Sequence, residues 1–447
     1  MFNLPSIKPN FITRDVEAPL SLSERVIYWT IILTPIWWLM GIQPLFYPAV
    51  MIGLLSVHFS LDKLIEKPFP IAVWAWLAMS IAMLWTAALG INDMGFNLQV
   101  ALAATVTFMK SYFMIFACLA LPFFARVRVE VITRATAWMT AGFLVTIAIQ
   151  VAMLFLKIGG SGYTPLLASL LPGDKGSLRV NFASLSKFLG VPFPRTALYT
   201  PDPPILGICA VLCFLICLGE TNKPLRKFAL AGAFSAVLVS SSRSALVVLP
   251  LALLIGFCFE SDLFRQLSLW LTSLTLVGCS ILGLTFKELL EKPMEGFDKV
   301  RDNSADSSGE RALVVQRTLE AWQQSPWIGW GVIRGNAHLY EDVYIGLGSF
   351  STYSAVLYLN GIFGFIALIG AMVLTLFAVY MPAIRGDDSC KWAFCGLIAL
   401  YLACNATPLS WMAANLWFFF AWLGAVMFAA LPDRADVSSW EQLSAQK

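Results

Sequence analysis

Arg243 is the first residue of this chain whose surroundings could do chemistry. It stands in the run Ser240-Ser241-Ser242-Arg243-Ser244, between two short apolar segments. Hydroxyl and guanidinium donors that crowd together form a concavity suited to a phosphate. An arginine that snorkels at a helix end gives the same pattern, so both interpretations stay open.

A second candidate, Arg311, lies in a polar stretch from Lys287 to Gly348. The spacing Ser-x-x-Glu predicts a helix that begins near Ser308 and continues to about Gln324. At about 100° per residue, Arg311 falls on the apolar stripe of this helix. An inward arginine needs an anionic partner, since an unpaired buried charge is costly. That partner is either a buried carboxylate or a bound anion.

The neighbouring Arg317 falls on the polar face of the same helix. We expect it to face water and to pair with Glu320, three residues further on.

The elements that position these arginines are apolar. The chain is 58% hydrophobic and 13% charged, with 16 Trp in 447 residues, which is the composition of a polytopic membrane protein. Spans of roughly 20 residues cross the hydrocarbon core, and about a dozen are predicted. They lie near 26–42, 44–61, 71–90, 98–122, 136–156, 203–219, 228–241, 244–259, 267–286, 352–380, 391–408 and 411–431. The predicted class is therefore all-α.

The basic residues of the short loops predict the orientation of the spans. Lys63, Arg128, Lys223 and Arg385 represent four loops that fall on one side, which should be the cytoplasm, with both termini there. No cleavable signal peptide is expected at the start of the chain. The predicted organisation is 1–25 cytoplasmic, 26–286 transmembrane with an external loop near 157–202, 287–350 a large external catalytic loop, 351–431 transmembrane and 432–447 a cytoplasmic tail.

Several classes of chemistry lack their residues. The two histidines, His58 and His338, cannot form a metal cluster, and the cysteines lie in or beside predicted spans. Cys209, Cys213 and Cys217 share a helix face and are expected to pack. We expect neither a metal nor a cofactor, and no nucleic-acid partner. Acidic residues are scarce inside the spans, which argues against a proton-coupled transporter.

The residues after the predicted external helix are recognisable. Pro326-Trp327-Ile328-Gly329-Trp330-Gly331 follows it, and a later span contains Asn360-Gly361-Ile362-Phe363-Gly364. Together with the earlier Ser-Arg pair, this succession resembles the O-antigen ligase and O-antigen polymerase family over roughly Pro194 to Gly364. Pro194-Arg195 and Pro201-Asp202-Pro203-Pro204 resemble the family's Arg-then-Pro-Asn segment, with Pro-Pro in place of Pro-Asn.

The resemblance implies a membrane glycosyltransferase of the C type, in a bacterial inner membrane. Such enzymes take a glycan from undecaprenyl diphosphate and attach it to an acceptor at the external leaflet. Arg243 and Arg311 would bind the carrier diphosphate, and Arg195 would join them or orient the acceptor. Ser242 and Ser244 would assist, and no metal would be needed, because the arginines stabilise the leaving group.

One position departs from the family pattern. Ligases carry a histidine eleven residues before the glycine that matches Gly361, and this chain has Phe350 there. An imidazole that could deprotonate the acceptor is therefore missing. His338, Glu341 and Asp342 are the nearby substitutes, each also explicable as an exposed loop residue. Strong activation by the arginines could also make a positioned base unnecessary.

Aromatic residues crowd the same region. Trp330 and Tyr353 are candidates for stacking on sugar rings or on the isoprenoid tail, and they equally suit an interfacial aromatic belt.

The missing histidine favours a polymerase that joins carrier-linked oligosaccharide units into an O-antigen, capsule or exopolysaccharide. A ligase that moves the finished glycan to a lipid or protein acceptor is the alternative. A transporter or flippase of lipid-linked sugars is a rival from another class, and a scaffold that has lost catalysis is a further possibility. The partners expected are a carrier-linked donor, a glycan acceptor, membrane lipids and a chain-length regulator.

Overall fold

The computed structural model describes most of the chain. The described residues are 19–66, 69–158, 160, 162–165, 178–188, 191–260, 305–338 and 344–431. The span predicted at 267–286 and the tail predicted at 432–447 lie outside them.

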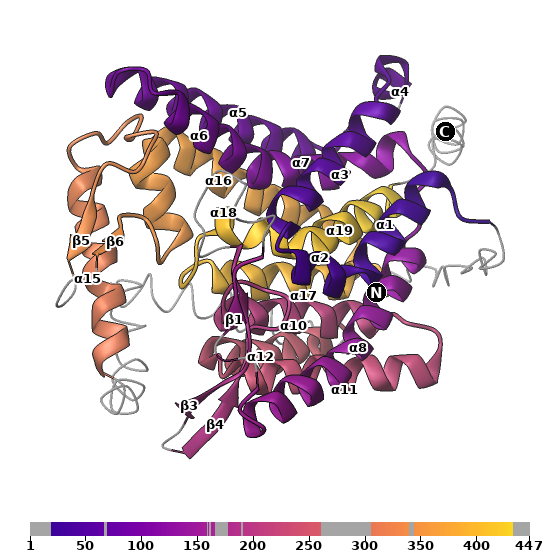
Figure 1. Cartoon of the computed structure of the whole chain (residues 1–447). Helices are drawn as coiled ribbons and strands as arrows, with labels where there is room; N and C mark the ends of the chain where they lie inside the picture. Colours follow the sequence, from indigo (N-terminus) through magenta and orange to yellow (C-terminus); the bar gives the residue numbers. More distant parts are fainter. Residues whose placement is uncertain are drawn as a thin grey trace, which may run out of the picture.

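Long helices make up the body of the molecule (Figure 1). The first half contains α1 (Leu22–Ile32), α2 (Thr34–Met40), α3 (Gln43–His58), α4 (Leu61–Glu66), α5 (Ile71–Asp93), α6 (Leu98–Lys110), α7 (Tyr112–Phe124) and α8 (Val129–Phe155). The second half contains α10 (Pro203–Cys217), α11 (Lys223–Ser240), α12 (Arg243–Glu260), α15 (Ala305–Trp322), α16 (Thr352–Ile384), α17 (Asp388–Ala403), α18 (Leu409–Met412), the 3-10 turn η3 (Ala413–Leu416) and α19 (Trp417–Ala429).

Five stretches of the described chain are long and apolar enough to cross a membrane. They are Ile71–Asp93, Leu98–Phe124, Val129–Phe155, Thr352–Ile384 and Leu409–Ala429. Pro203–Cys217 and Arg243–Phe259 are shorter apolar helices. The structure thus supports an integral membrane protein, while a count of about twelve spans and the C-type glycosyltransferase fold stay predictions.

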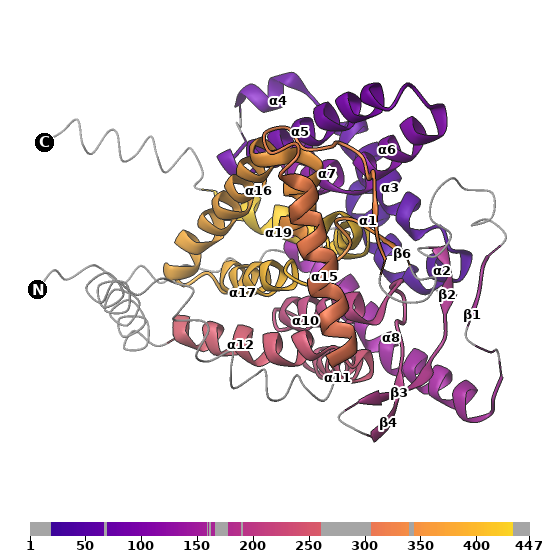
Figure 2. The same cartoon turned by 90° about the vertical axis from the view of Figure 1, so that its left-hand side faces the viewer.

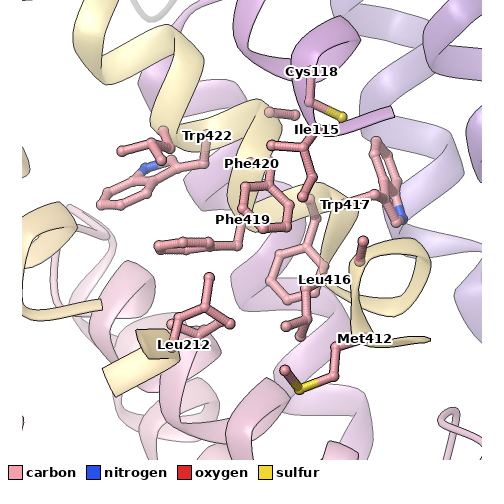
Figure 3. Close-up of a cluster of buried hydrophobic side chains, with 14 of the residues drawn as sticks. Ile115, Cys118, Leu212, Met412, Leu416, Trp417, Phe419, Phe420 and Trp422 are labelled. Carbon is pink, nitrogen blue, oxygen red and sulfur yellow. The ribbon is translucent and has the colours of Figure 1, made fainter. Parts of the chain in front are cut away.

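The core forms around the aromatic helix α19. Phe419, Phe420 and Trp422 are at most 2% exposed and lie among side chains of α7 and α10, including Ile115 and Leu212 (Figure 3). Buried apolar side chains on every face of a helix are typical of a helix that is surrounded by other helices. This packing fixes the central helices relative to one another.

Ion pairs gather the predicted cytoplasmic loops at one end of the bundle. Arg128 binds the fully buried Glu24 at 2.7 Å, and Arg134 binds Glu220 at 2.8 Å. Lys63 donates to the Phe124 carbonyl at 2.8 Å. The structure therefore places these loops together, while the side of the membrane they face remains a prediction.

The opposite end carries α15 and the strand pair β5–β6 (Figure 1, left). Helix α5 reaches from one end to the other: Phe69, just before it, packs against Phe124, and Asp93 at its far end binds Arg334 at 3.2 Å. α15 crosses this end of the bundle in the second view (Figure 2).

The described chain is mostly helical, as predicted, and its loops add three two-stranded antiparallel sheets. β1 (Gly162–Tyr163) pairs with β2 (Val180–Asn181), β3 (Ser184–Phe188) with β4 (Val191–Arg195), and β5 (Asn336–His338) with β6 (Tyr344–Gly346). β4 contains two prolines, which lack an amide donor and fit only an edge strand. Strands this short do not show a clear alternation of apolar and polar residues in the sequence.

Two predicted helix boundaries were wrong. The first span, 26–42, is divided into α1 and α2 at Leu33, because Pro35 occupies the first turn of a new helix. α15 begins at Ala305 rather than near Ser308. Asn303, Ser304, Ser307 and Ser308 all have side chains able to cap a helix, so the local sequence does not select one start.

Candidate functional site

Arg195 and Asp202 lie at the two ends of a firmly held turn. Arg195 closes β4, and Asp202 stands just before α10. Residues 196–200 between them are all buried. The Thr196 amide donates to the Val239 carbonyl at 3.0 Å, and the Thr200 hydroxyl donates to the Asp202 carbonyl at 3.0 Å. The turn is thus fixed to the end of α11 and holds both charged residues in place.

Arg311 of α15 acts electrostatically on the same carboxylate. Partial burial raises the pKa of the Asp202 carboxyl group, and the guanidinium groups of Arg195 and Arg311 oppose this rise. Among the described residues, no ion pair joins the three side chains, and the buried Nε of Arg195 has no hydrogen-bond partner. The three charges therefore influence one another while leaving their hydrogen-bonding capacity for a ligand.

Phe350 forms the wall behind Arg311. The guanidinium carbon lies 5.2 Å from the centroid of the Phe350 ring, a cation–π contact. On the same helix Val314 and Thr318 are 1% and 0% exposed, and Thr318 accepts a hydrogen bond from the Gly348 amide at 3.0 Å. The prediction that Arg311 turns towards the protein is confirmed, since its side chain is partly buried.

The opposite face of α15 also matches its prediction. Arg317 and Glu320 are exposed and form an ion pair at 3.0 Å. They line an open surface groove with an empty volume of about 980 Å³, together with Leu313, Ala321, Gln324, Asn336, Ala337, His338 and Leu347. His338 thus lies on the Arg317 side of the helix, where its ring contacts Tyr344 at 5.0 Å.

The serine-rich return between α11 and α12 packs on the first turns of α10. Ser241 has the left-handed φ of 50° that the tight return requires, and the hydroxyl groups of Ser242 and Ser244 are 3.0 Å apart. A Cβ on Gly207 would lie 2.7 Å from that of Ser242, so α10 touches the return closely. Arg243, the first residue of α12, is exposed beside it. The roles of Arg243, Ser242 and Ser244 in binding stay predictions.

The two recognisable glycine motifs form one docking joint, in which Pro326–Gly331 lies in a break of α16. The break is at Gly361, which has φ 63° and ψ −166°. Four backbone amides donate across the joint: Trp330 to Tyr358 at 2.9 Å, Gly331 to Leu359 at 2.7 Å, Ile362 to Pro326 at 2.9 Å, and Phe363 to Trp327 at 3.3 Å. These motifs therefore position the loop that follows α15.

Trp330 and Tyr353 take part in internal contacts. The Trp330 indole donates to the Ala321 carbonyl of α15 at 2.9 Å, and its ring faces the Arg334 guanidinium at 4.8 Å. The Tyr353 hydroxyl donates to the Tyr401 carbonyl at 3.0 Å. Their part in substrate binding stays a prediction, because these contacts are structural.

The remaining candidates for a base are Glu341 and Asp342, which lie outside the described residues. Among the residues that are described, no three His, Cys, Asp or Glu side chains gather as metal ligands. Metal-independent transfer stays a prediction.

Sequence reasoning did not single out Asp202 as a candidate. The motif Pro201-Asp202-Pro203-Pro204 was noted only for its likeness to a family segment. A usable signal was present: Pro204 follows at the second helical position, so one of the two amides that an N-cap side chain usually accepts from is missing. Its nearness to Arg311 has no signal in the local sequence.

The arrangement suits two tasks. Two guanidinium groups that face a shared space can bind an oxyanion with more than one charge. A carboxylate between them can accept a proton or a hydrogen bond from a hydroxyl group. The apolar helices define an integral membrane protein, and the binding of an anion by these arginines stays a prediction.

Comparison with known families agrees with this description. Residues 228–369 match the family model described as O-antigen ligase. The match includes Arg243, Arg311 and Phe350 and confirms the resemblance, while Arg195 and Asp202 lie upstream of it. No curated protein matches the chain.

Proposed function

We propose that the protein is a glycosyltransferase that polymerises undecaprenyl-diphosphate-linked oligosaccharide units into a cell-surface polysaccharide. The observation that carries the proposal is the buried Nε of Arg195, which has no hydrogen-bond partner. Arg195 and Arg311 both act on the charge of Asp202. A carrier diphosphate would supply the oxygen acceptors that these guanidinium groups lack.

The arginines would act mainly on the leaving group. As the bond between the sugar and the phosphate breaks, negative charge grows on the diphosphate, and fixed donors that hold this charge lower the barrier. Arg243 would add a further positive charge from the neighbouring return. The reaction needs no ATP, because the phosphate–sugar bond of the donor supplies the driving force, and we propose that it needs no metal.

In the polymerase, the growing chain on one carrier is the donor, and a sugar hydroxyl of a second carrier-linked unit attacks it. Both substrates would enter from the membrane. We place the site at the external leaflet of a bacterial inner membrane, with the basic loops and both termini in the cytoplasm and a C-type glycosyltransferase fold. A chain-length regulator would be a partner.

A ligase is the second candidate, favoured by the description of the matching family. It would use the same arginines and the same donor, and would differ only in its acceptor, a lipid or a protein. Phe350 in place of the family's histidine is the reason for placing the polymerase first.

The purified protein in detergent, supplied with a carrier-linked oligosaccharide, separates these functions. Glycans of two or more units would show a polymerase, and transfer only to an added lipid or protein acceptor would show a ligase. Unchanged substrate in every mixture would refute both and favour a transporter.

Two variants of α15 test the site itself. Arg311→Ala should lower the transfer rate by at least about 100-fold, the typical effect of removing one donor to developing charge. Arg317→Ala, on the exposed face of the same helix, is the matched control and should retain the rate. Equal rates in both variants would contradict a catalytic role for Arg311.

A further inference from the structure

Asp202 occupies the N-cap position of α10, yet its side chain makes no capping hydrogen bond. Aspartate is among the best N-cap residues because its carboxylate accepts from the first amides of the helix. Here Pro204 removes one of those amides, and the Asp202 carbonyl accepts from the amides of Ile205 and Leu206 at 3.1 Å each. The backbone carbonyl of Asp202 thus accepts the first hydrogen bonds of the helix, and the carboxylate makes no capping bond.

The groups that face Asp202 come from several elements. Arg195 of β4 and Arg311 of α15 act on its charge directly. Arg179 lines a small recess next to it, together with Thr200 and Pro201. Among the described residues, none of these forms an ion pair with Asp202, and the carboxylate is exposed enough for a ligand to reach it.

The sign of the charge decides which substrate the carboxylate can contact. A diphosphate held by Arg195 and Arg311 would repel a carboxylate at hydrogen-bond distance, because both are anions. A neutral sugar hydroxyl, by contrast, can donate to the carboxylate while its oxygen faces the donor sugar. The position beside the arginines therefore suits the acceptor.

The usual place for a base is closed in this chain. Phe350 stands where the family's ligases carry a histidine, and its ring covers the Arg311 guanidinium. A phenyl ring accepts no proton, so any general base must come from another wall of the site.

We propose that Asp202 is the general base that accepts the proton of the acceptor hydroxyl, an inference that rests on the proposed function. As the hydroxyl oxygen forms its bond to the anomeric carbon, its proton moves to a carboxylate oxygen of Asp202. The bond from the anomeric carbon to the phosphate oxygen breaks, and its electron pair leaves with the carrier diphosphate. Water then removes the proton from Asp202 and restores the carboxylate.

The electrostatic surroundings agree with this role. Desolvation raises the pKa of Asp202 above its ordinary value, and the guanidinium groups of Arg195 and Arg311 oppose this rise, so the group is a stronger base than a free aspartate. The active form is the deprotonated one. The rate should therefore fall as the pH drops through this raised pKa.

The test compares Asp202→Asn and Asp202→Glu with wild type in the purified transfer assay. Asp202→Asn should lower the turnover number by about 100-fold or more, with little change in the KM for the carrier-linked donor, and should abolish the acid limb of the pH profile. Asp202→Glu should recover part of the turnover. Asp62→Asn, an exposed acid on α4, is the control and should behave as wild type.

A second set of variants distinguishes a catalytic role of Asp202 from a role in positioning the arginines. Placing a histidine behind Arg311, in the double variant Asp202→Asn with Phe350→His, should restore part of the turnover and move the acid limb towards the pKa of an imidazole. Melting curves of all variants show whether they are folded. The double variant keeps the inference testable if Asp202→Asn alone is weakly expressed.

Three results would overturn the inference. Asp202→Asn could keep the turnover number and the pH profile of wild type. The protein would then be a transferase that does not use Asp202 as its base. Asp202→Asn and Asp202→Glu could instead raise the donor KM equally with an unchanged pH profile, which would make Asp202 a residue that positions the arginines. An inactive wild type, with intact melting behaviour, would refute the proposed function and this inference with it.

Discussion

Gly361 provides a direct test of how the arginine helix is held in place. Its φ of 63° with ψ of −166° breaks α16, and this region of backbone space is essentially open to glycine alone. A Cβ at this position would also lie 2.2 Å from the Trp327 carbonyl oxygen. Gly361→Ala therefore introduces both backbone strain and a clash with the docked loop Pro326–Gly331.

The magnitude follows from the contacts at the joint. The strained backbone costs about 1–3 kcal/mol. Displacing the loop also weakens backbone hydrogen bonds across the joint, those of Trp330, Gly331 and Ile362 among them, at about 1 kcal/mol each. We expect a loss of about 3–6 kcal/mol in the free energy of unfolding.

Heating the detergent-solubilised protein and measuring the folded fraction provides the assay. Gly361→Ala should lower the apparent melting temperature by on the order of 5 °C or more. Gly370→Ala in the same helix is the matched control, because its Cβ would meet nothing within 4 Å. That variant should be neutral or stabilising, by up to about 1 kcal/mol.

The same substitution should also affect catalysis. The loop holds α15 through the hydrogen bond from Trp330 to Ala321, so its displacement should move Arg311 and slow transfer. If Gly361→Ala melted and reacted like Gly370→Ala, the joint would not position the site, and the reasoning from backbone strain would be refuted.

Two further predictions concern the scaffold. Glu24→Gln should destabilise the protein by about 3–5 kcal/mol at neutral pH, since it leaves Arg128 without its buried partner. Burial alone would raise the pKa of Glu24, but the hydrogen bonds from Arg128 and Ser21 lower it below the ordinary 4.5. Wild type should therefore lose the stability contributed by this ion pair as the pH falls below about 4.5. The melting temperature of the variant should depend less on pH. Gly232→Ala should lower the melting temperature because its Cβ would lie 2.1 Å from the Thr140 carbonyl oxygen, whereas Gly142→Ala, with nothing within 4 Å, should not; equal melting of the two would contradict close packing of α8 on α11.

The sequence predicted the features that depend on local chemistry. Long apolar runs identified the five longest spanning stretches, and the helical period placed Arg311 on the inner face of α15 and Arg317 on the outer face. Both signals arise from the contrast between apolar and polar surroundings, which acts on each segment separately.

The features it did not predict depend on contacts between distant segments. The hairpin β3–β4 is too short for a periodic signal, and its prolines weaken the strand pattern further. The break in α16 is stabilised by a loop that comes about thirty residues earlier, so nothing in the motif itself shows that its glycine is bent. Arg311 acts on the charge of Asp202 although the two residues are more than a hundred positions apart in the sequence. α15, which carries Arg311, crosses the end of the bundle (Figure 2).

Replacing histidine by phenylalanine at position 350 has a physical consequence for Arg311. A phenyl ring attracts the guanidinium group by about 0.5–2 kcal/mol through its π face. The ring accepts no hydrogen bond from Arg311 and gains no competing positive charge at low pH. Arg311 thus keeps all its donors for an anion and is held in orientation. In the proposed mechanism, Phe350 would support the cation that holds the leaving group. The carboxylate of Asp202, on which Arg195 and Arg311 act, would accept the proton of the hydroxyl group. The double variant Asp202→Asn with Phe350→His therefore moves the proposed base from position 202 to position 350. The acid limb of its pH profile shows which group accepts the proton.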